Sequence, residues 1–124
     1  MSYVDGFLVA VATADKDKYV AYAKRFGSYF LERGALRMTE CWGDDVPHGK
    51  QTDFFRAVQA RDDEAVVFSW IEWPDKATRD AAMAQMDEAM KSDPRFDFEK
   101  NPMPFDGKRM IFGGFRPLVD VAKP

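Results

Sequence analysis

The chain has 124 residues, of which 46% are hydrophobic and 31% charged, and its net charge is −3. This composition is typical of a globular protein with one core, and we expect residues 1–124 to form a single domain. The acidic balance and the absence of a basic stretch argue against nucleic-acid binding. No apolar run is long enough to cross a membrane. Cys41 is the single cysteine, which fits a reducing compartment, so we expect a cytoplasmic protein.

The first third of the chain predicts a strand, a helix and a second strand. Residues 3–12 are dense in β-branched and aromatic side chains and predict the first strand. Thr13 and Asp15 then offer side-chain oxygens that can cap a helix, and Gly34 suits its C-terminus. Residues 35–42 alternate between apolar and polar side chains well enough to predict the second strand. The apolar face of the helix consists of residues at helical spacing, namely Tyr19, Tyr22, Ala23, Phe26 and Phe30.

The middle of the chain predicts a loop and the strongest strand. Residues 43–50 contain Asp-Asp, Pro and Gly and indicate a loop. Residues 52–57 fit either a helical turn capped by Thr52 or Asp53, or a strand extension. Residues 65–73, which are almost entirely apolar, predict a third strand.

The last third predicts a helix from Asp75 to about Lys91 with Ala82, Met83, Met86 and Met90 on its apolar face. Three prolines indicate that residues 92–107 form an irregular connection. Residues 109–116 predict the last strand, in which the paired glycines 113–114 indicate a bulge or a close backbone approach rather than a phosphate-binding loop. We expect the tail after Pro117 to be loosely ordered.

This order, β-α-β twice, predicts a ferredoxin-like α+β fold with a four-stranded antiparallel sheet and both helices on one face. The strands 3–12 and 65–73 are apolar on both faces, whereas a half-solvated sheet should alternate apolar with polar. The second face therefore needs a cover. A second copy of the sheet, giving a two-fold homodimer, is the simplest one. The alternative cover is the segment 92–107, folded back with Phe96, Phe98, Met103 and Phe105.

Four separated blocks of the sequence, spanning nearly the whole chain, resemble one family. They are Tyr3-Val4-Asp5-Gly6-Phe7, Glu40-Cys41-Trp42-Gly43-Asp44-Asp45-Val46-Pro47, Val67-Phe68-Ser69-Trp70-Ile71 and Met103-Pro104-Phe105-Asp106-Gly107-Lys108-Arg109-Met110. The family is that of the bacterial domain of unknown function 1428. The resemblance implies a dimeric α+β barrel fold related in shape to small monooxygenases, and it implies no activity.

The most informative candidates for a site are carboxylates among aromatic side chains. Glu40 shares a strand face with Trp42, and Glu72 shares a strand face with Trp70. Buried carboxylates must be paired or have raised pKa values, and their possible cationic partners are Arg37, Arg56 and Arg109. A polar spot in an apolar cavity is how ligand pockets are usually lined. The alternative is a structural ion pair at the end of the sheet, or simple exposure beyond the dimer contact, and we give this alternative more weight.

Weaker candidates lie next to Glu40. Asp44, Asp45 and His48 offer metal-ligand chemistry, but their spacing matches no established site and a solvated turn explains them. Cys41 is a candidate nucleophile only if a neighbouring cation or base activates it. No motif specifies a reaction, and neither a metal nor a cofactor is indicated.

Three hypotheses on function follow. The first is a small-molecule binding protein or cofactor-free enzyme with a cavity between sheet and helices lined by Glu40, Trp42, Trp70 and Glu72. The second hypothesis is a non-catalytic dimeric interaction protein. The third, a barrel-type oxygenase, rests on fold analogy alone. We rank them in this order.

Overall fold

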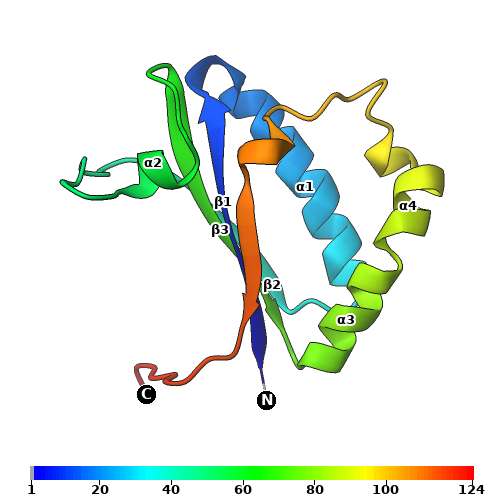
Figure 1. The fold of residues 1–124 in the computed structure, drawn as a ribbon. Coiled ribbons are helices and arrows are strands. Elements are labelled where there is room, and N and C mark those ends of the chain that lie inside the picture. Colours follow the sequence, from blue (N-terminus) through cyan, green and yellow to red (C-terminus); the bar gives the residue numbers. More distant parts are fainter. Residues whose placement is uncertain (1) are drawn as a thin grey trace.

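In the computed structural model, which describes residues 2–124, four strands form one antiparallel sheet (Figure 1). The strands are β1 (Tyr3–Ala12), β2 (Arg37–Trp42), β3 (Glu64–Trp73) and β4 (Ile111–Phe115). Their order in the sheet is β2-β3-β1-β4, and every neighbouring pair is antiparallel. This is the ferredoxin-like arrangement that the sequence predicts, and the α+β class is therefore confirmed.

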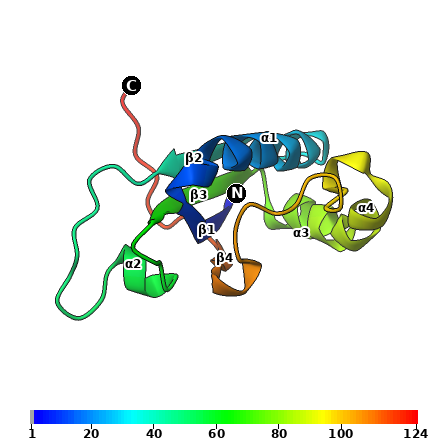
Figure 2. The same ribbon diagram turned by 90° about the horizontal axis from the view of Figure 1, so that it is seen from above.

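The long helices lie on one side of this sheet. They are α1 (Lys16–Glu32), α3 (Lys76–Ala84) and α4 (Met86–Ser92), whereas the single turn α2 (Phe54–Ala57) lies on the other side (Figure 2). The described residues also form three short 3-10 turns, namely η1 (Thr13–Asp15), η2 (Pro94–Phe96) and η3 (Gly107–Arg109). The one helix expected between Asp75 and Lys91 is divided at Gln85 into α3 and α4.

Several predicted helix ends are confirmed. Asp75 Oδ1 accepts the N–H of Thr78 at 2.7 Å at the start of α3. Gly34 follows α1 with φ of +105°, a conformation that costs a side-chain-bearing residue more than glycine. The capping role expected of Thr13 and Asp15 is wrong. Asp15 has φ −102° and ψ 15° rather than the extended backbone of a capping residue, and Thr13 Oγ1 instead donates to the carbonyl of Asp63.

The main core lies between the helices and the sheet. Trp73, Tyr29 and Phe96 are its largest fully buried side chains. The segment 92–107 passes over the helix side of the sheet, where Phe96 is buried and Phe98 packs against the same cluster. The expected alternative, in which this segment covers the second sheet face, is therefore wrong. Met90, expected on the apolar face of its helix, is exposed.

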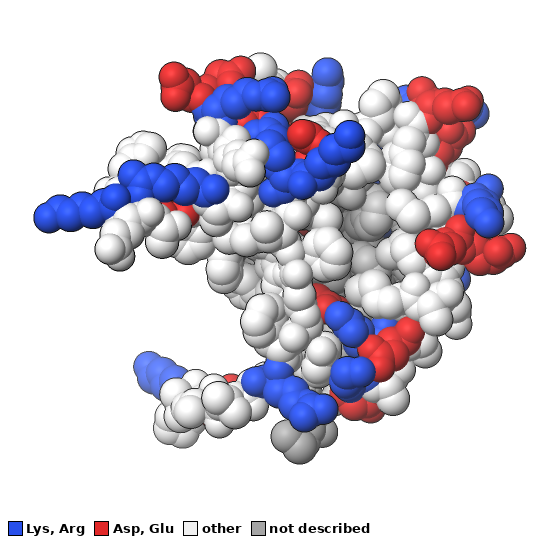
Figure 3. All heavy atoms as spheres, in the orientation of Figure 1, with Lys and Arg blue, Asp and Glu red and all other residues white. Residues whose placement is uncertain are grey.

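The sheet face opposite α1, called here the open face, has little cover from its own chain. At one end, α2 and its flanks pack over Ala10 and Val66. Toward the other end, Phe68, Ile111 and Phe115 remain 48%, 44% and 62% exposed. Figure 3 shows an uncharged, concave surface on this side, bounded by two projecting segments. The apolar second face that the sequence predicts is thus present and open.

One polar atom in the core has no partner within residues 2–124. Tyr29 is fully buried and its hydroxyl makes no hydrogen bond. Since a buried hydroxyl without a partner carries a desolvation cost, Tyr29→Phe should raise the free energy of unfolding by about 1 kcal/mol. Urea unfolding of the two proteins measures this difference. A less stable Tyr29→Phe variant would show that the hydroxyl has a partner in solution.

An ion pair fixes the start of β3 to η3. Arg109 donates from both terminal nitrogens to Glu64, at 2.7 and 2.8 Å, and both side chains are nearly buried. The hydrogen bonds from Arg109 lower the pKa of Glu64 to about 2. A carboxylate with a lowered pKa stabilises the fold above its unfolded-state pKa, and this stability is lost as the pH falls toward its folded-state pKa.

We therefore expect Glu64 to contribute to a loss of stability between about pH 4.5 and 2. The measurement is the melting temperature against pH for the wild type and Glu64→Gln. The variant should melt below the wild type at neutral pH, and the two curves should converge toward pH 2. Parallel curves over this range would contradict the role given to Glu64.

Candidate functional site

A carboxyl group and a phenol meet between α1 and the sheet. Glu40 projects from β2 toward the helices, and Tyr19 projects from the first turns of α1 toward the sheet. The hydroxyl of Tyr19 donates to Oε1 of Glu40 at 2.6 Å. The short distance is typical of a hydrogen bond from a hydroxyl to a charged acceptor. Residues 21 positions apart thereby form one polar spot in an apolar layer.

The surroundings of this pair are aromatic. The Tyr19 ring contacts the rings of Tyr22 and Phe105, with centroids 5.9 Å away in both cases. Phe105 reaches over from the segment before η3 and meets Tyr22 edge-on at 5.1 Å. Trp42 packs against the same hydrophobic cluster. Tyr19, Tyr22 and Phe105 thus form an aromatic cluster that Glu40 meets through the Tyr19 hydroxyl.

The electrostatic state of Glu40 follows from this burial. Removal from water raises the pKa of Glu40, while the hydrogen bond from Tyr19 and the neighbouring Ser69 hydroxyl lower it, with the upward effect larger. Burial, followed by the charge of Glu40, raises the pKa of Tyr19 well above its usual range. Within residues 2–124 no Lys or Arg lies within ion-pair distance of Glu40. Glu40 is therefore not the structural ion pair considered as the alternative.

Glu40 retains hydrogen-bonding capacity. An ionised carboxylate offers about four acceptor positions, and the hydroxyls of Tyr19 and Ser69 occupy at most two of them. The group is half-buried rather than sealed. It can thus accept a hydrogen bond or a proton from a further donor. The ammonium group of Lys16 lies over the ring of Trp42, 5.3 Å from its centroid.

The structure separates the four side chains expected to line one cavity. Glu40 and Trp42 face the helices, whereas Trp70 and Glu72 face the open side of the sheet. Glu72 accepts from Trp70 Nε1 at 3.1 Å and lies 3.8 Å from Arg37 Nε. Arg37, one of the expected cationic partners, thus pairs with Glu72. The four residues do not form one site.

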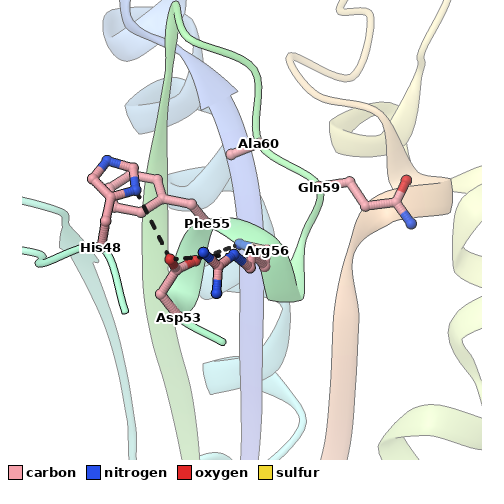
Figure 4. A pocket seen from close by; sticks show the side chains of 6 residues that line it. All are labelled: His48, Asp53, Phe55, Arg56, Gln59 and Ala60. Carbon is pink, nitrogen blue, oxygen red and sulfur yellow. Dashed lines mark hydrogen bonds and ion pairs between the residues drawn. The ribbon is translucent and has the colours of Figure 1, made fainter. Parts of the chain in front are cut away.

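Arg56 lies on the open side, in a hollow of about 500 Å³ beside α2. We call this the α2 hollow, and it is lined by His48, Asp53, Phe55, Arg56, Gln59 and Ala60 (Figure 4). Asp53 is its one carboxylate, and it accepts the backbone N–H groups of Arg56 and Gly49 at 2.7 and 3.0 Å. These bonds lower the pKa of Asp53. Asp53 therefore serves as the cap of α2, which settles residues 52–57 as a helical turn.

The weaker candidates do not converge on Glu40. His48 stacks on Phe55 with centroids 4.4 Å apart, on the opposite side of the sheet from Glu40. Asp44 and Asp45 are exposed in the loop after β2, and Cys41 is exposed on the open face. In the described part of the chain, no three His, Cys, Asp or Glu side chains lie close enough to hold a metal ion.

Sequence reasoning missed the partners of Glu40. The sequence predicts Tyr19 and Tyr22 on the apolar face of the first helix and Phe105 as a possible cover of the second sheet face, and it predicts no contact of these residues or of Ser69 with Glu40. One signal was available. A tyrosine on the buried face of a helix carries a hydroxyl that needs a partner, and the face of α1 has two such residues before its midpoint.

Comparison with known proteins finds a matching family model and similar bacterial sequences. Residues 2–107 match the family model described as "Protein of unknown function (DUF1428)". The chain is 54% identical over 120 residues to the uncharacterized protein YbaA of Escherichia coli K12, covering 97% of this chain and 99% of the relative. YbaA of Shigella flexneri matches to the same extent.

Solved structures with the same fold show little sequence similarity. SnoaB, a cofactor-independent oxygenase from Streptomyces nogalater solved in a mutant form, has a TM-score of 0.58 at 15% identity, over 98% of both chains. A dimeric ferredoxin-like protein from an uncultured marine organism has a TM-score of 0.54 at 14% identity, over 99% of this chain and 100% of the other. At these identities the likeness establishes the fold alone. No helix within residues 2–124 is long and apolar enough to span a membrane.

Proposed function

Because the chain belongs to the DUF1428 family of proteins of unknown function, we propose from its own geometry that it binds a small aromatic molecule at Glu40. The observation that carries this proposal is a half-buried carboxyl group that has no cation partner among the described residues and is hydrogen-bonded to the aromatic cluster of Tyr19, Tyr22 and Phe105. Leaving a carboxyl group in such surroundings costs stability. A ligand that uses its acceptor positions offsets that cost.

The chemistry of the site selects the ligand class. Aromatic walls favour a flat apolar body that can pack edge-on or offset against rings. The carboxyl group favours an O–H or N–H donor on that body, and it disfavours an anion. A neutral phenol or a similar aromatic donor fits both requirements. The likeness of fold to a cofactor-independent oxygenase is consistent with a site that uses side chains alone.

The pH dependence of binding follows from the raised pKa of Glu40. The ionised form accepts a hydrogen bond more strongly than the neutral acid. Binding of a donor ligand should therefore weaken as the pH falls through this pKa.

The test uses 2-naphthol, a neutral fluorescent aromatic alcohol. Loss of a hydrogen bond to a charged group should reduce affinity about 10- to 100-fold in Glu40→Gln, with a melting temperature near that of the wild type. Fluorescence titration measures the affinity. Glu72→Gln is the matched control, because it makes the same substitution on the open face and should bind like the wild type. Equal affinity in Glu40→Gln and the wild type, or no saturable binding by the wild type, would contradict the proposal.

The assembly that carries this site is a homodimer joined through the open face. Phe68, Ile111 and Phe115 are exposed there, and the segment 92–107, the other expected cover, lies on the helix side. A contiguous apolar face of this kind usually marks an interface. The dimeric ferredoxin-like neighbour supports this assembly, in which the two Glu40 sites lie on the outer sides of the paired sheets.

A further inference from the structure

The tail after β4 (residues 117–124, called the tail) is apolar and has no packing partner in the described part of its own chain. Leu118, Val119 and Val121 are 95%, 79% and 86% exposed. Isolated exposed apolar residues are common, but three within four positions indicate a contact surface. The tail and the loop carrying α2 both project from the side of the sheet away from the long helices (Figures 1 and 2).

We propose that the tail docks in the α2 hollow of a second copy of this chain. The proposal rests on the homodimer inferred above and adds the element that each copy supplies to the other. The α2 hollow has an apolar floor formed by Phe55 and Ala60 and an open volume of about 500 Å³. Apolar side chains of the tail fit such a floor, and Leu118 and Val121 are the best placed to do so by their exposure.

Charges match between the two elements. On the rim of the α2 hollow, His48 and Arg56 have side chains that are 78% and 50% exposed, whereas the carboxylate of Asp53 is only 4% exposed. The rim therefore presents donors and positive charge. Asp120 is the one acidic residue of the tail, and it lies between the apolar residues Val119 and Val121. A pair between Asp120 and Arg56 is the ionic contact that this docking predicts.

Geometry favours the partner's hollow over the tail's own. The α2 hollow lies over Ala10, while β4 ends with Phe115 opposite Val4. These two positions on β1 are about 20 Å apart at 3.3 Å per residue. The chain leaves β4 running away from its own α2 hollow, so the tail would have to reverse to reach it. A two-fold axis across the strands instead brings each tail to the α2 hollow of the other copy.

The test is cross-linking between chains. Two proteins are made in a Cys41→Ser background, one with Gln59→Cys in the α2 hollow and one with Val121→Cys in the tail. They are mixed to allow exchange and treated with bismaleimidoethane, and one carries a purification tag. Because docking raises the effective concentration to the millimolar range, the mixed dimer should cross-link about tenfold more than a control mixture of Ser28→Cys and Val121→Cys chains. Ser28 is exposed on α1, on the helix side.

The outcomes separate this proposal from the homodimer itself. Cross-linking no greater than the control, in a sample that light scattering shows to be dimeric, overturns the tail docking and leaves the homodimer in place. A sample with the 14.2 kDa mass of one chain overturns both. A chain carrying both cysteines that cross-links within itself, without forming a covalent dimer, shows that the tail folds back and overturns the docking.

Discussion

Replacement of Asp5 by asparagine is expected to lower the free energy of unfolding by about 3 kcal/mol, because the change breaks a buried ion pair and removes the buried carboxylate partner of Arg79. Asp5 is 3% exposed. Its carboxylate accepts hydrogen bonds from Arg79 Nε and Nη2 at 3.1 and 2.9 Å, and from Trp73 Nε1 at 2.9 Å. These bonds join β1, β3 and α3 at the centre of the fold.

Tyr3 and Gly114 pack closely around the ion pair of Asp5 and Arg79. Arg79 lies over the ring of Tyr3 at 5.2 Å from its centroid. A Cβ at Gly114 would lie 2.3 Å from the Tyr3 hydroxyl and 2.9 Å from Arg79 Nη2. Gly114 pairs with Asp5 in regular register, so the paired glycines form no bulge, and the close backbone approach explains this position.

Asp80→Asn is the matched control for Asp5→Asn. Asp80 also accepts from Arg79, at 2.9 Å, but its side chain is 46% exposed. Exposed pairs contribute little, so this variant should unfold near the wild type. The measurement is the urea midpoint at one fixed protein concentration. Equal midpoints for Asp5→Asn and Asp80→Asn would show that burial of Asp5 does not decide its contribution.

A lysine in place of Phe68 is expected to dissociate the proposed homodimer. Phe68 lies on the open face, opposite Leu8 on one neighbouring strand and Cys41 on the other. It meets the ring of Trp70 at 5.6 Å. A charge placed in the middle of an apolar interface loses its hydration without gaining a partner. Loss of such a central aromatic contact costs about 2 kcal/mol or more, which weakens association by roughly 30-fold or more.

Phe112→Lys controls for the effect of the substitution itself. Phe112 is 71% exposed, but it stacks on Phe7 on the helix side of the sheet. Light scattering across a concentration series should give twice the 14.2 kDa chain mass for the wild type and Phe112→Lys, and a falling mass for Phe68→Lys. A Phe68→Lys protein that stays dimeric throughout the series would place the interface elsewhere.

Local pattern was sufficient to predict the strands and the long helix. Residues 65–73 are apolar except for Ser69 and Glu72, and the strand observed is Glu64–Trp73. The helix stripe through Tyr19, Ala23 and Phe30 is buried as predicted. The break at Gln85 was not predicted, because the apolar spacing continues across it from Met83 to Met86.

The composition of the site could not be predicted, because it depends on strand register. Alternation correctly grouped Glu40 with Trp42, and Glu72 with Trp70. Whether the two groups share a face of the sheet depends on the register between β2 and β3. Glu40 is opposite Ser69, and Ser69 lies on the face of β3 that Trp70 and Glu72 do not share. Since a shift of one residue exchanges the faces of a strand, and both faces of β3 are apolar, the sequence held no signal for the choice.

The contact between Glu40 and Tyr19 is a tertiary one that no local pattern reports. It depends on how α1 lies over β2, and the close approach of Met38 to Gly27 shows how tightly these elements meet: a Cβ at Gly27 would lie 2.7 Å from Met38 Cε. The contact of Phe105 with Tyr19 and Tyr22 depends on the path of the irregular segment 92–107. Neither could be read from spacing along the chain.

The most direct test of the proposed site is the pKa of Glu40, measured by carboxyl ¹³C NMR titration of the wild type and Tyr19→Phe. Burial should hold the pKa of Glu40 above the ordinary value of 4.5. Tyr19→Phe should raise it further, because the lost hydrogen bond favoured the ionised form. A pKa at or below 4.5, unchanged in Tyr19→Phe, would mean that Glu40 is an ordinary solvated carboxylate and that the proposed ligand site is wrong.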